Sequence, residues 1–429
     1  MRIGELYNLF EESAGITTDS RKVSDGELFF ALKGENFDGN EFALQAVQKG
    51  ALSAIVDDPS VVSDRMILVD DVLDTLQELS TYHREKLGLK VLAITGTNGK
   101  TTTKELLASV LSKKFKVHST KGNLNNQIGV PLTILSAPRD TELMIVEMGA
   151  SRPGDIEELC EIAKPDFGMI TNIGEAHIAG FGDIDGVIGT KTELYRYLKS
   201  NGGFAFYNDN DKVLSDQINS TEVKAIPLSS VNGSDLIVET VKVWPTLVLD
   251  LRYGESSSRI STNMFGDYNL DNIKSAVAIG LYFDVGITEI VGAIESYNPS
   301  NNRSQILQTP FNTLICDAYN ANPVSMRKAI NSFLSVRADN KMCVLGDMLE
   351  LGDLALQEHR DILDLLDNRD LRVILVGELF SLASLNSGFL SFRDVSQAEQ
   401  FLNKEKIRGA TILLKGSRGI GLERLFRLF

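Results

Sequence analysis

The stretch from Val91 to Lys104 constrains the fold more than any other part of the chain. It reads VLAITGTNGKTTTK, an apolar run followed by a glycine-rich turn and then by helix-forming sequence. A strand, a glycine-rich turn, a lysine, a hydroxyl residue and a helix, in that order, are typical of a phosphate-binding loop. The usual loop carries an earlier glycine where this chain has Ile94, so the stretch predicts a shorter variant. An ordinary strand-to-helix turn is the alternative.

Each part of this loop has a chemical reason. Gly96 and Gly99 allow backbone N–H groups to close around phosphate oxygens, and the helix N-terminus adds the positive end of a dipole. Lys100 supplies a cation for the outer phosphates of a nucleotide, and Thr101 supplies an oxygen for Mg²⁺. The predicted nucleotide-binding segment comprises Gly96, Thr97, Asn98, Gly99, Lys100, Thr101 and Thr102.

Length and charge limit the remaining possibilities. A chain of 429 residues is too long for one hydrophobic core, so two or three domains are expected. A hydrophobic content of 43% and a charged content of 24% are those of a globular protein. The net charge of −15 argues against general nucleic-acid binding. An anionic ligand will therefore need cations placed close to it.

The cysteines and the N-terminal segment indicate a cellular compartment. Cys160, Cys316 and Cys343 are far apart and odd in number, which favours reduced, semi-buried thiols over a disulfide framework. The first residues, MRIGELYNLFEESAG, are acidic and lack the apolar core of a signal peptide. We find no apolar run long enough to span a bilayer. These features predict a cytoplasmic protein with no membrane insertion, and the lack of heptads favours a monomer.

Residues 1–85 mix strand and helix patterns. Apolar runs at 28–32, 51–56 and 66–69 predict three strands, and the segment 71–87 predicts an amphipathic helix. Polar loops flank the first strand, and one of them contains Ser20 and Arg21. Loops beside a strand often hold ligands, although plain surface loops are the alternative.

Residues 86–299 alternate strands and helices, which predicts a mainly parallel sheet with helices on both faces. Ligands of such sheets lie at the carboxyl ends of the strands. Glu147 and His177 both lie at the carboxyl ends of predicted strands, and a carboxylate and a neutral imidazole are reasonable Mg²⁺ partners. A lone histidine is otherwise more often structural. The amide-rich segment 123–129 suits either a solvated loop or contacts to a polar ligand. The segment 266–272 precedes an apolar helix that is mostly core, and its amide-rich start could present a side chain to a nucleotide.

Residues 300–429 begin within a linker-like segment, NPSNN at 298–302, and restart the α/β alternation beyond it. Strands are predicted at 313–316, 342–345, 372–376 and 411–414, with helices between them. This is the pattern of a second doubly wound, Rossmann-like domain of common size. The fold class is therefore α/β, with a small first domain, a central phosphate-loop domain and a C-terminal domain.

Several motifs together resemble the ATP-dependent Mur ligases, over essentially the whole chain. They are GTNGKTTT, GNLNNQIGVP, EMGAS, NIGEAH, KTEL, GDYNLDNI, DAYNANPVSMRKAI, GDMLELG and LKGSRG, in that order. Within this family, TDSRKVSDGELFFALKGENFDG, DAYNANPVSM and GDMLELG are similar to the members that join D-alanyl-D-alanine to UDP-N-acetylmuramoyl-tripeptide. The related ligase that adds the third amino acid is expected to carry a DYAHTP-like stretch in place of DAYNANP.

The resemblance implies domains for the UDP-MurNAc-peptide at 1–85, for ATP at 86–299 and a C-terminal Rossmann-like domain at 300–429. It also implies a reaction of peptidoglycan precursor synthesis. ATP phosphorylates the tripeptide carboxylate, and the amine of D-Ala-D-Ala displaces phosphate from the acyl phosphate. A carboxylate lacks a leaving group, and phosphorylation provides one. Positioning and charge neutralisation then carry most of the catalysis.

The resemblance assigns roles to single residues. Lys100 is expected to hold the β- and γ-phosphates, Thr101 and Glu147 one Mg²⁺, and His177 a second Mg²⁺. Lys191 matches a lysine that is carbamylated in relatives, which turns a cation into an anionic metal ligand; a structural lysine is the alternative. The other expected nucleotide contacts are Asn272, Arg303 near the γ-phosphate, and Asp317 near the ribose. The expected substrate contacts are Ser20, Arg21, Asn123, Asn126, Tyr319, Asn320 and Asn322.

Other functions stay open at this point. One is a ligase for another amino acid or another carboxylate, such as a folate- or cyanophycin-type enzyme, and the retained first domain argues against it. A nucleotide-dependent switch and an inactive scaffold are the others, and the intact lysines and acids of the central domain argue against a scaffold. Nucleotide contacts divided between two domains also predict a closure that excludes water from the acyl phosphate.

Overall fold

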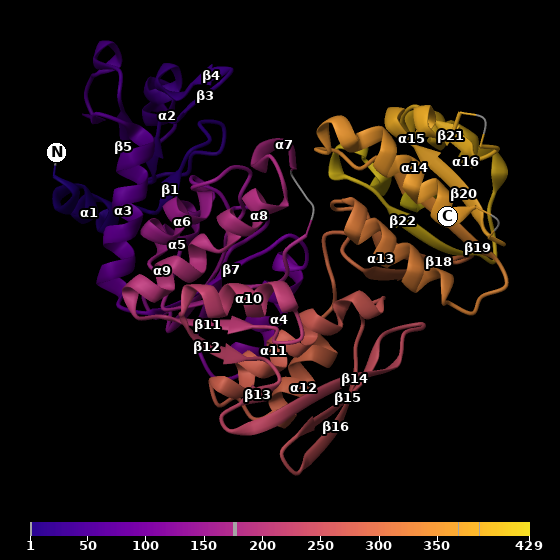
Figure 1. Cartoon of the computed structure of the whole chain (residues 1–429). Helices are drawn as coiled ribbons and strands as arrows, with labels where there is room; N and C mark the ends of the chain where they lie inside the picture. The colour runs from indigo at the N-terminus through magenta and orange to yellow at the C-terminus, as the bar shows by residue number, and fades with distance from the viewer. Residues whose placement is uncertain (1, 175–177, 368, 386) are drawn as a thin grey trace.

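The computed structural model describes residues 2–174, 178–367, 369–385 and 387–429. Figure 1 shows three lobes that follow one another along the chain, each with its own parallel or mainly parallel sheet. His177, a predicted metal ligand, lies outside the described residues. No helix in the described ranges combines the length and the apolar character needed to cross a bilayer.

The first lobe is a four-stranded parallel sheet in the order β1-β2-β5-β6, with a small hairpin beside it. Its strands are β1 (Ile16–Thr17), β2 (Leu28–Phe30), β3 (Lys33–Gly34), β4 (Phe37–Asp38), β5 (Ser53–Val56) and β6 (Met66–Leu68). Its helices are α1 (Ile3–Glu12), α2 (Ala43–Gln48) and α3 (Val72–Leu87). The three strands and the amphipathic helix expected from the sequence are confirmed, whereas α1, β1 and the hairpin were not predicted.

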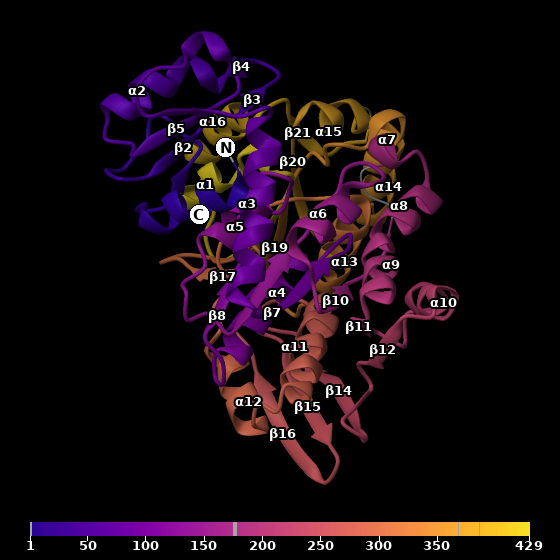
Figure 2. The same cartoon turned by 90° about the vertical axis from the view of Figure 1, so that its left-hand side faces the viewer.

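Helix α3 joins the first two lobes. Asp71 caps its start by accepting a hydrogen bond from Asp74 N at 2.9 Å, and Gly88 ends it with a left-handed φ of 61°. Its Leu76 and Leu79 are fully buried in the first lobe's core, which also includes Leu135 of helix α5 (Gly129–Leu135). Figure 2 shows α3 running beside α5. The helix therefore extends across residue 85, the predicted end of the first domain.

The central lobe is built on a six-stranded, wholly parallel sheet in the order β12-β11-β10-β7-β9-β8. The strands are β7 (Lys90–Thr95), β8 (Val117–Ser119), β9 (Leu143–Glu147), β10 (Phe167–Ile170), β11 (Phe204–Tyr207) and β12 (Lys224–Pro227). Separate hydrophobic cores lie on the two faces of the sheet, so the predicted two-sided α/β layering is confirmed. The helices are α4 (Lys100–Leu111), α5, α6 (Asp155–Ala163), α7 (Ile178–Phe181), α8 (Ile184–Lys191), α9 (Glu193–Asn201), α10 (Lys212–Thr221), α11 (Leu270–Tyr282) and α12 (Ile287–Ser296).

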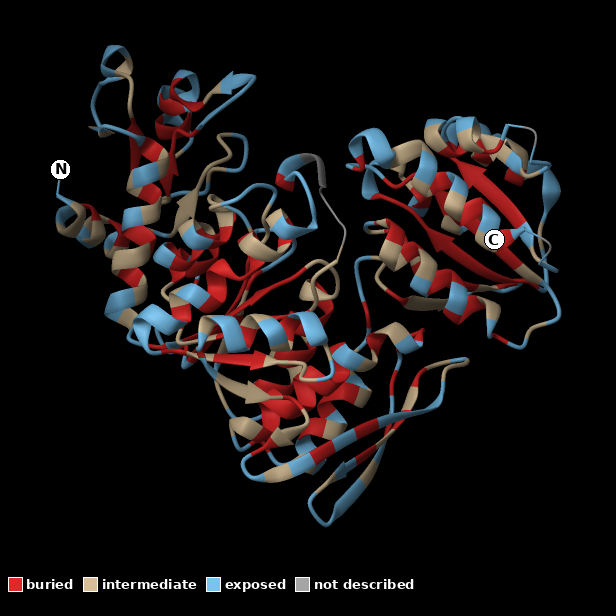
Figure 3. Cartoon of the chain, in the orientation of Figure 1, coloured by how far each residue is buried: buried red, intermediate tan, exposed pale blue. Residues whose placement is uncertain are grey.

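An antiparallel sheet interrupts the expected alternation before α11. It consists of β13 (Ser230–Val231), β14 (Ser234–Lys242), β15 (Val248–Tyr253) and β16 (Ser256–Ser261). In β15, Leu249 and Leu251 are buried and their neighbours are less so, as expected for a sheet with one packed face (Figure 3). The sequence analysis did not predict this sheet, because its strands are polar on one face.

The C-terminal lobe has a six-stranded sheet in the order β17-β18-β22-β19-β20-β21, in which only β17 is antiparallel. The strands are β17 (Gln305–Gln308), β18 (Thr313–Asp317), β19 (Lys341–Gly346), β20 (Arg372–Val376), β21 (Leu390–Phe392) and β22 (Thr411–Lys415). The helices are α13 (Pro323–Leu334), α14 (Ala355–Leu366), α15 (Glu378–Ala383) and α16 (Val395–Glu405). The Rossmann-like arrangement is confirmed, while β17 and β21 were not predicted.

The three cysteines are free thiols, as expected from their number and spacing, but they are fully buried and not semi-buried. Burial raises the pKa of Cys316 to about 12, so this thiol stays protonated near neutral pH. Burial also raises the pKa of Cys160 and of Cys343.

Candidate active site

The loop between β7 and α4 has the predicted order of strand, glycine-rich turn and helix. Gly96 and Gly99 have left-handed φ values of 135° and 83°. A Cβ atom at Gly96 would lie 2.1 Å from Thr171 Oγ1, and one at Gly99 would lie 2.4 Å from Asn272 Oδ1. Both positions therefore require glycine.

The start of α4 offers free backbone donors. The first i−4 hydrogen bond at this end runs from Thr103 N to Gly99 O at 2.8 Å, so the N–H groups just before it have no helical acceptor. Lys100 Nζ folds back over the loop and donates to Gly96 O at 2.6 Å and to Thr97 O at 3.3 Å. Burial lowers the pKa of Lys100. The negative charge of Glu147 raises this pKa, and the positive charge of nearby Arg303 lowers it further, but burial has the largest effect. This geometry suits an anion at the helix N-terminus.

Glu147 ends β9 beside this loop and is only 2% exposed. Its Oε1 accepts from Thr101 Oγ1 at 3.2 Å and from Asn125 Nδ2 at 2.9 Å. Its Oε2 lies 3.2 Å from Lys104 Nζ, an ion pair that lacks the geometry of a hydrogen bond. Burial opposes ionisation of Glu147, but the cations Lys104 and Lys100 outweigh it and lower its pKa.

Lys191 ends α8 and is 3% exposed. Its Nζ lies 5.6 Å from the centre of the Phe181 ring, and no carboxylate in the described part of the chain lies within ion-pair distance of it. Burial, with the repulsion of Lys100, lowers the pKa of Lys191 to about 7. A substantial fraction of this amine is therefore neutral at physiological pH.

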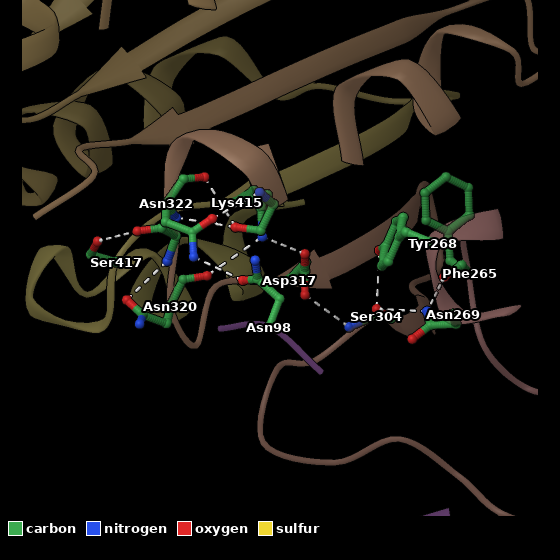
Figure 4. A network of polar contacts seen from close by, with 12 residues as sticks. Asn98, Phe265, Tyr268, Asn269, Ser304, Asp317, Asn320, Asn322, Lys415 and Ser417 are labelled. Carbon is green, nitrogen blue, oxygen red and sulfur yellow. Dashed lines mark hydrogen bonds and ion pairs between the residues drawn. The ribbon is translucent and has the colours of Figure 1, made fainter. Parts of the chain in front are cut away.

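The C-terminal lobe faces the phosphate loop through residues that follow β18. Asn322 Nδ2 donates to Asn98 Oδ1 at 2.8 Å, which links the two lobes directly (Figure 4). Asp317, at the end of β18, pairs with Lys415 at 2.6 Å. The Arg303 guanidinium stacks on the Tyr319 ring, with 3.6 Å between its central carbon and the ring centre.

These residues line one cavity of about 530 Å³. Of the site residues expected from the sequence, the cavity brings together Gly96, Thr97, Asn98, Gly99, Lys100, Thr101, Thr102, Asn126, Glu147, Lys191, Asn272, Arg303, Asp317, Tyr319, Asn320 and Asn322. Such a crevice at the carboxyl ends of parallel strands, next to the central strand β7, is where α/β sheets bind ligands.

Three expected substrate contacts lie outside this cavity. Arg21 is exposed and pairs with Asp19 in its own loop, and the carbonyl of neighbouring Ser20 accepts from Lys49 Nζ at 2.9 Å. Asn123 and Asn126 are both exposed, but only Asn126 lines the cavity, where its Oδ1 accepts from Gly129 N at 2.9 Å at the start of α5. A role for the first-lobe residues thus requires a substrate that extends between the lobes.

Sequence analysis missed three residues of the site. Lys104 follows Lys100 and Thr101 by one helical turn, and this spacing places it on the same side of α4. Asn125 lies between the two amides that were singled out, and composition alone does not show which amide points inward. Ser304, next to Arg303, lines the cavity as well.

The donor set beside the loop fits Mg²⁺. The Thr101 hydroxyl and an ionised Glu147 supply hard oxygen ligands 3.2 Å apart. Among the described residues there is no cluster of three or more acidic, histidine or cysteine side chains. Such a sparse protein contribution matches Mg²⁺ sites in which phosphates and water complete the shell.

Family models match most of the chain in three consecutive segments. Residues 12–88 match the "Mur ligase family, catalytic domain", 94–280 the "Mur ligase middle domain", and 302–418 the "Mur ligase, glutamate ligase domain". The chain belongs to the Mur ligase family.

Full-length relatives identify a particular branch of this family. The UDP-N-acetylmuramoyl-tripeptide–D-alanyl-D-alanine ligase of Bacillus subtilis is 34% identical, and the match covers 96% of this chain and 92% of that protein. A crystal structure of MurF from Acinetobacter baumannii is 32% identical with a TM-score of 0.86, over 98% of this chain and 97% of that one. MurF ligase from Thermotoga maritima, solved with ADP, is 29% identical with a TM-score of 0.85 and 98% coverage of both chains.

Proposed function

We propose that this chain is an ATP-dependent ligase that joins D-alanyl-D-alanine to UDP-N-acetylmuramoyl-tripeptide in peptidoglycan precursor synthesis. The observation that carries the proposal is the shared cavity, in which the phosphate loop, Glu147 and Lys191 face Arg303 and Asp317 of the C-terminal side. The full-length similarity to ligases of this name supports the choice of substrates. Nucleotide-linked precursors and ATP are both available in the cytoplasm, where we expect it to act.

In this proposal, the central lobe binds ATP. The free N–H groups at the start of α4 and the Lys100 ammonium hold the β- and γ-phosphates. Arg303 approaches the γ-phosphate from the opposite wall, while Asn272 and Asp317 contact the nucleoside. These fixed charges stabilise the negative charge that moves between oxygens during phosphoryl transfer.

Mg²⁺, when bound, would neutralise phosphate charge and orient the transferred group. Thr101 and Glu147 are the residues that would hold it, with His177 and Lys191 as further candidates. Lys191 suits carbamylation, because only a neutral amine attacks CO₂ and this amine has a pKa of about 7. The step forms an N–C bond and releases one proton, which leaves an anionic carbamate at Lys191.

The two other substrates would meet at the same cavity. The tripeptide carboxylate attacks the γ-phosphorus, which forms an acyl phosphate and releases ADP. The amine of D-Ala-D-Ala then attacks the acyl carbon, and phosphate leaves with one former carboxylate oxygen while the amine loses a proton. We place the UDP-sugar end on the first lobe near Ser20 and Arg21, the peptide near Asn123 and Asn126, and the dipeptide near Tyr319, Asn320 and Asn322.

An isotope experiment tests the acyl phosphate. The tripeptide carboxylate is labelled with ¹⁸O, and the phosphate released during ligation is analysed by mass spectrometry. The proposal predicts one ¹⁸O atom in each phosphate released from fully labelled substrate. Unlabelled phosphate with normal product formation would show that the carboxylate is not the group phosphorylated.

A further inference from the structure

Ser304 has an unusual backbone conformation next to a key cation. It follows Arg303 directly and has a left-handed φ of 49°, while Asn301 and Asn302 just before it have φ values of 57°. Asparagine tolerates this region, but serine adopts it less readily. Ser304 is also only 5% exposed. The surrounding structure must therefore hold this residue in place.

The central lobe holds Ser304 through its hydroxyl and its carbonyl. Ser304 Oγ is hydrogen-bonded to the Tyr268 hydroxyl at 3.0 Å and accepts from Asn269 Nδ2 at 3.2 Å. Its carbonyl accepts from Phe265 N at 3.2 Å. Gly266 allows this arrangement, since a Cβ atom there would lie 2.1 Å from the Tyr268 ring.

The C-terminal lobe holds Ser304 through its backbone N–H. Ser304 N donates to Asp317 Oδ1 at 3.1 Å, and Asp317 Oδ2 pairs with Lys415 Nζ at 2.6 Å. Figure 4 shows Ser304 between the Tyr268–Asn269 pair on one side and Asp317 on the other. One buried residue thus connects both walls of the cavity.

The orientation of the Arg303 side chain depends on how the neighbouring residue Ser304 is held. Its Nε is buried and has no hydrogen-bond partner among the described residues, so no polar contact fixes that end of the guanidinium. The stacking of the guanidinium on the Tyr319 ring, with 3.6 Å between its central carbon and the ring centre, is not a directional hydrogen bond. The backbone at Ser304 therefore sets where the Arg303 side chain enters the cavity that also contains Lys100.

We propose that Ser304 is a positioning residue, which uses its hydrogen bonds to both lobes to aim Arg303 at the γ-phosphate of bound ATP. The inference rests on the nucleotide binding of the proposed function, but not on its other substrates. Loss of the Ser304 hydroxyl should weaken contacts to the γ-phosphate selectively. A residue that merely stabilised the fold would affect di- and triphosphates alike.

The test is a double-mutant cycle on nucleotide affinity. Calorimetry measures binding of AMP-PNP and of ADP, each with Mg²⁺, to the wild type, Ser304→Ala, Arg303→Ala and the double variant. Ser304→Ala should weaken AMP-PNP binding about fivefold and change ADP binding less than about twofold. In the Arg303→Ala background, Ser304→Ala should have no further effect on AMP-PNP. Equal weakening of both nucleotides, or the same loss in both backgrounds, would overturn the inference.

Further variants separate the hydroxyl from the backbone and from general stability. Ser304→Gly removes the hydroxyl but accepts the left-handed φ, so it should bind AMP-PNP as weakly as Ser304→Ala; wild-type affinity would overturn the role of the hydroxyl. Tyr268→Phe removes one partner of Ser304 Oγ and should reduce AMP-PNP affinity about twofold, even if Ser304→Ala fails to fold.

Ser80→Ala is the control. Ser80 is a buried serine of α3 that donates to the carbonyl of Gln77 in the same helix, and its replacement should change neither the AMP-PNP nor the ADP affinity. A failed ligation assay would refute the proposed function but leave these ratios measurable.

Discussion

The two regions expected to receive anionic substrates are built in opposite ways. Around the phosphate loop, the charged groups are buried and form ion pairs between residues far apart in the sequence, such as Lys104 with Glu147. In the first lobe, the Arg21 side chain is 84% exposed and its partner Asp19 is two residues away. The fold therefore holds the charged groups of the cavity in place before a ligand binds. The charged groups of the first lobe pair within one loop and remain exposed to solvent.

This difference has consequences for ligand binding. Hydrogen bonds from Arg21 lower the pKa of Asp19 to about 2, so both groups are charged at neutral pH. A diphosphate that binds Arg21 must compete with Asp19 and with water, and such exposed contacts contribute modestly. In the cavity, phosphate meets groups that have already lost much of their water, where electrostatic contacts are stronger.

The largest expected effect comes from Lys100→Met. Removing the cation at the outer phosphates should lower kcat by about a thousandfold or more, because transition-state charge loses a preorganised partner. Binding of the UDP-linked substrate should not change. Steady-state kinetics and calorimetry measure the two quantities. A loss of less than tenfold would mean that the loop is not the catalytic phosphate site.

Arg21→Ala should have the next largest effect and a different signature. We expect KM for UDP-MurNAc-tripeptide to rise about tenfold while kcat and the KM for ATP stay within about twofold, because a ground-state contact is lost. Arg252→Ala provides the matched control, since Arg252 is an exposed arginine paired with Glu239 in the antiparallel sheet. An unchanged KM in Arg21→Ala would remove the first-lobe loop from the substrate site.

Asn322→Ser tests the direct bridge between the lobes. Serine retains the helix cap at the start of α13 but is too short to reach Asn98. We expect KM for ATP to rise about threefold with the melting temperature nearly unchanged, as for the loss of one neutral hydrogen bond. If kinetics are unchanged, the bridge does not contribute to nucleotide binding.

The smallest expected effect is on how protein stability depends on pH, through a histidine of the first lobe. Burial lowers the pKa of His83, which lies on α3 and packs against Phe10 of α1. Below its ordinary value of about 6.5, the unfolded state binds a proton that the folded state does not, so stability falls as the pH drops. This residue should contribute a slope of at most ~1.4 kcal/mol per pH unit.

Denaturant unfolding at pH 5 and pH 7 measures this slope. In His83→Gln the stability difference between the two pH values should be smaller than in the wild type. An equal or larger difference would assign the acid sensitivity to other groups, such as the buried His118 and His359, whose pKa values are also lowered by burial.

Local patterns predicted most of the fold. The strand–loop–helix around Lys100, the amphipathic helix α3 and four of the C-terminal strands follow from periodicity, turns and caps within short windows. The antiparallel sheet β13–β16 was missed, because residues such as Leu249 and Leu251 alternate with polar neighbours in a region that otherwise reads as α/β. Short edge strands such as β17 carry too little pattern to be recognised.

The site residues also differ in how well the sequence predicted them. The residues of the phosphate loop were predicted as a contiguous motif, and their position around one cavity agrees with that hypothesis. Asn125 and Ser304 were missed, because their importance lies in contacts to Glu147 and Asp317 that only the folded chain creates. Lys104 was missed as well, although its helical spacing from Lys100 is a signal that could have identified it.

The most direct test of the account is phosphate release by the purified protein with ATP and Mg²⁺. UDP-MurNAc-tripeptide and D-Ala-D-Ala are added separately and together, and the product is weighed by mass spectrometry. The account predicts release only when both are present, with a product heavier by the dipeptide less one water. Release that occurs with the tripeptide and a single amino acid, or that ignores both substrates, would contradict it.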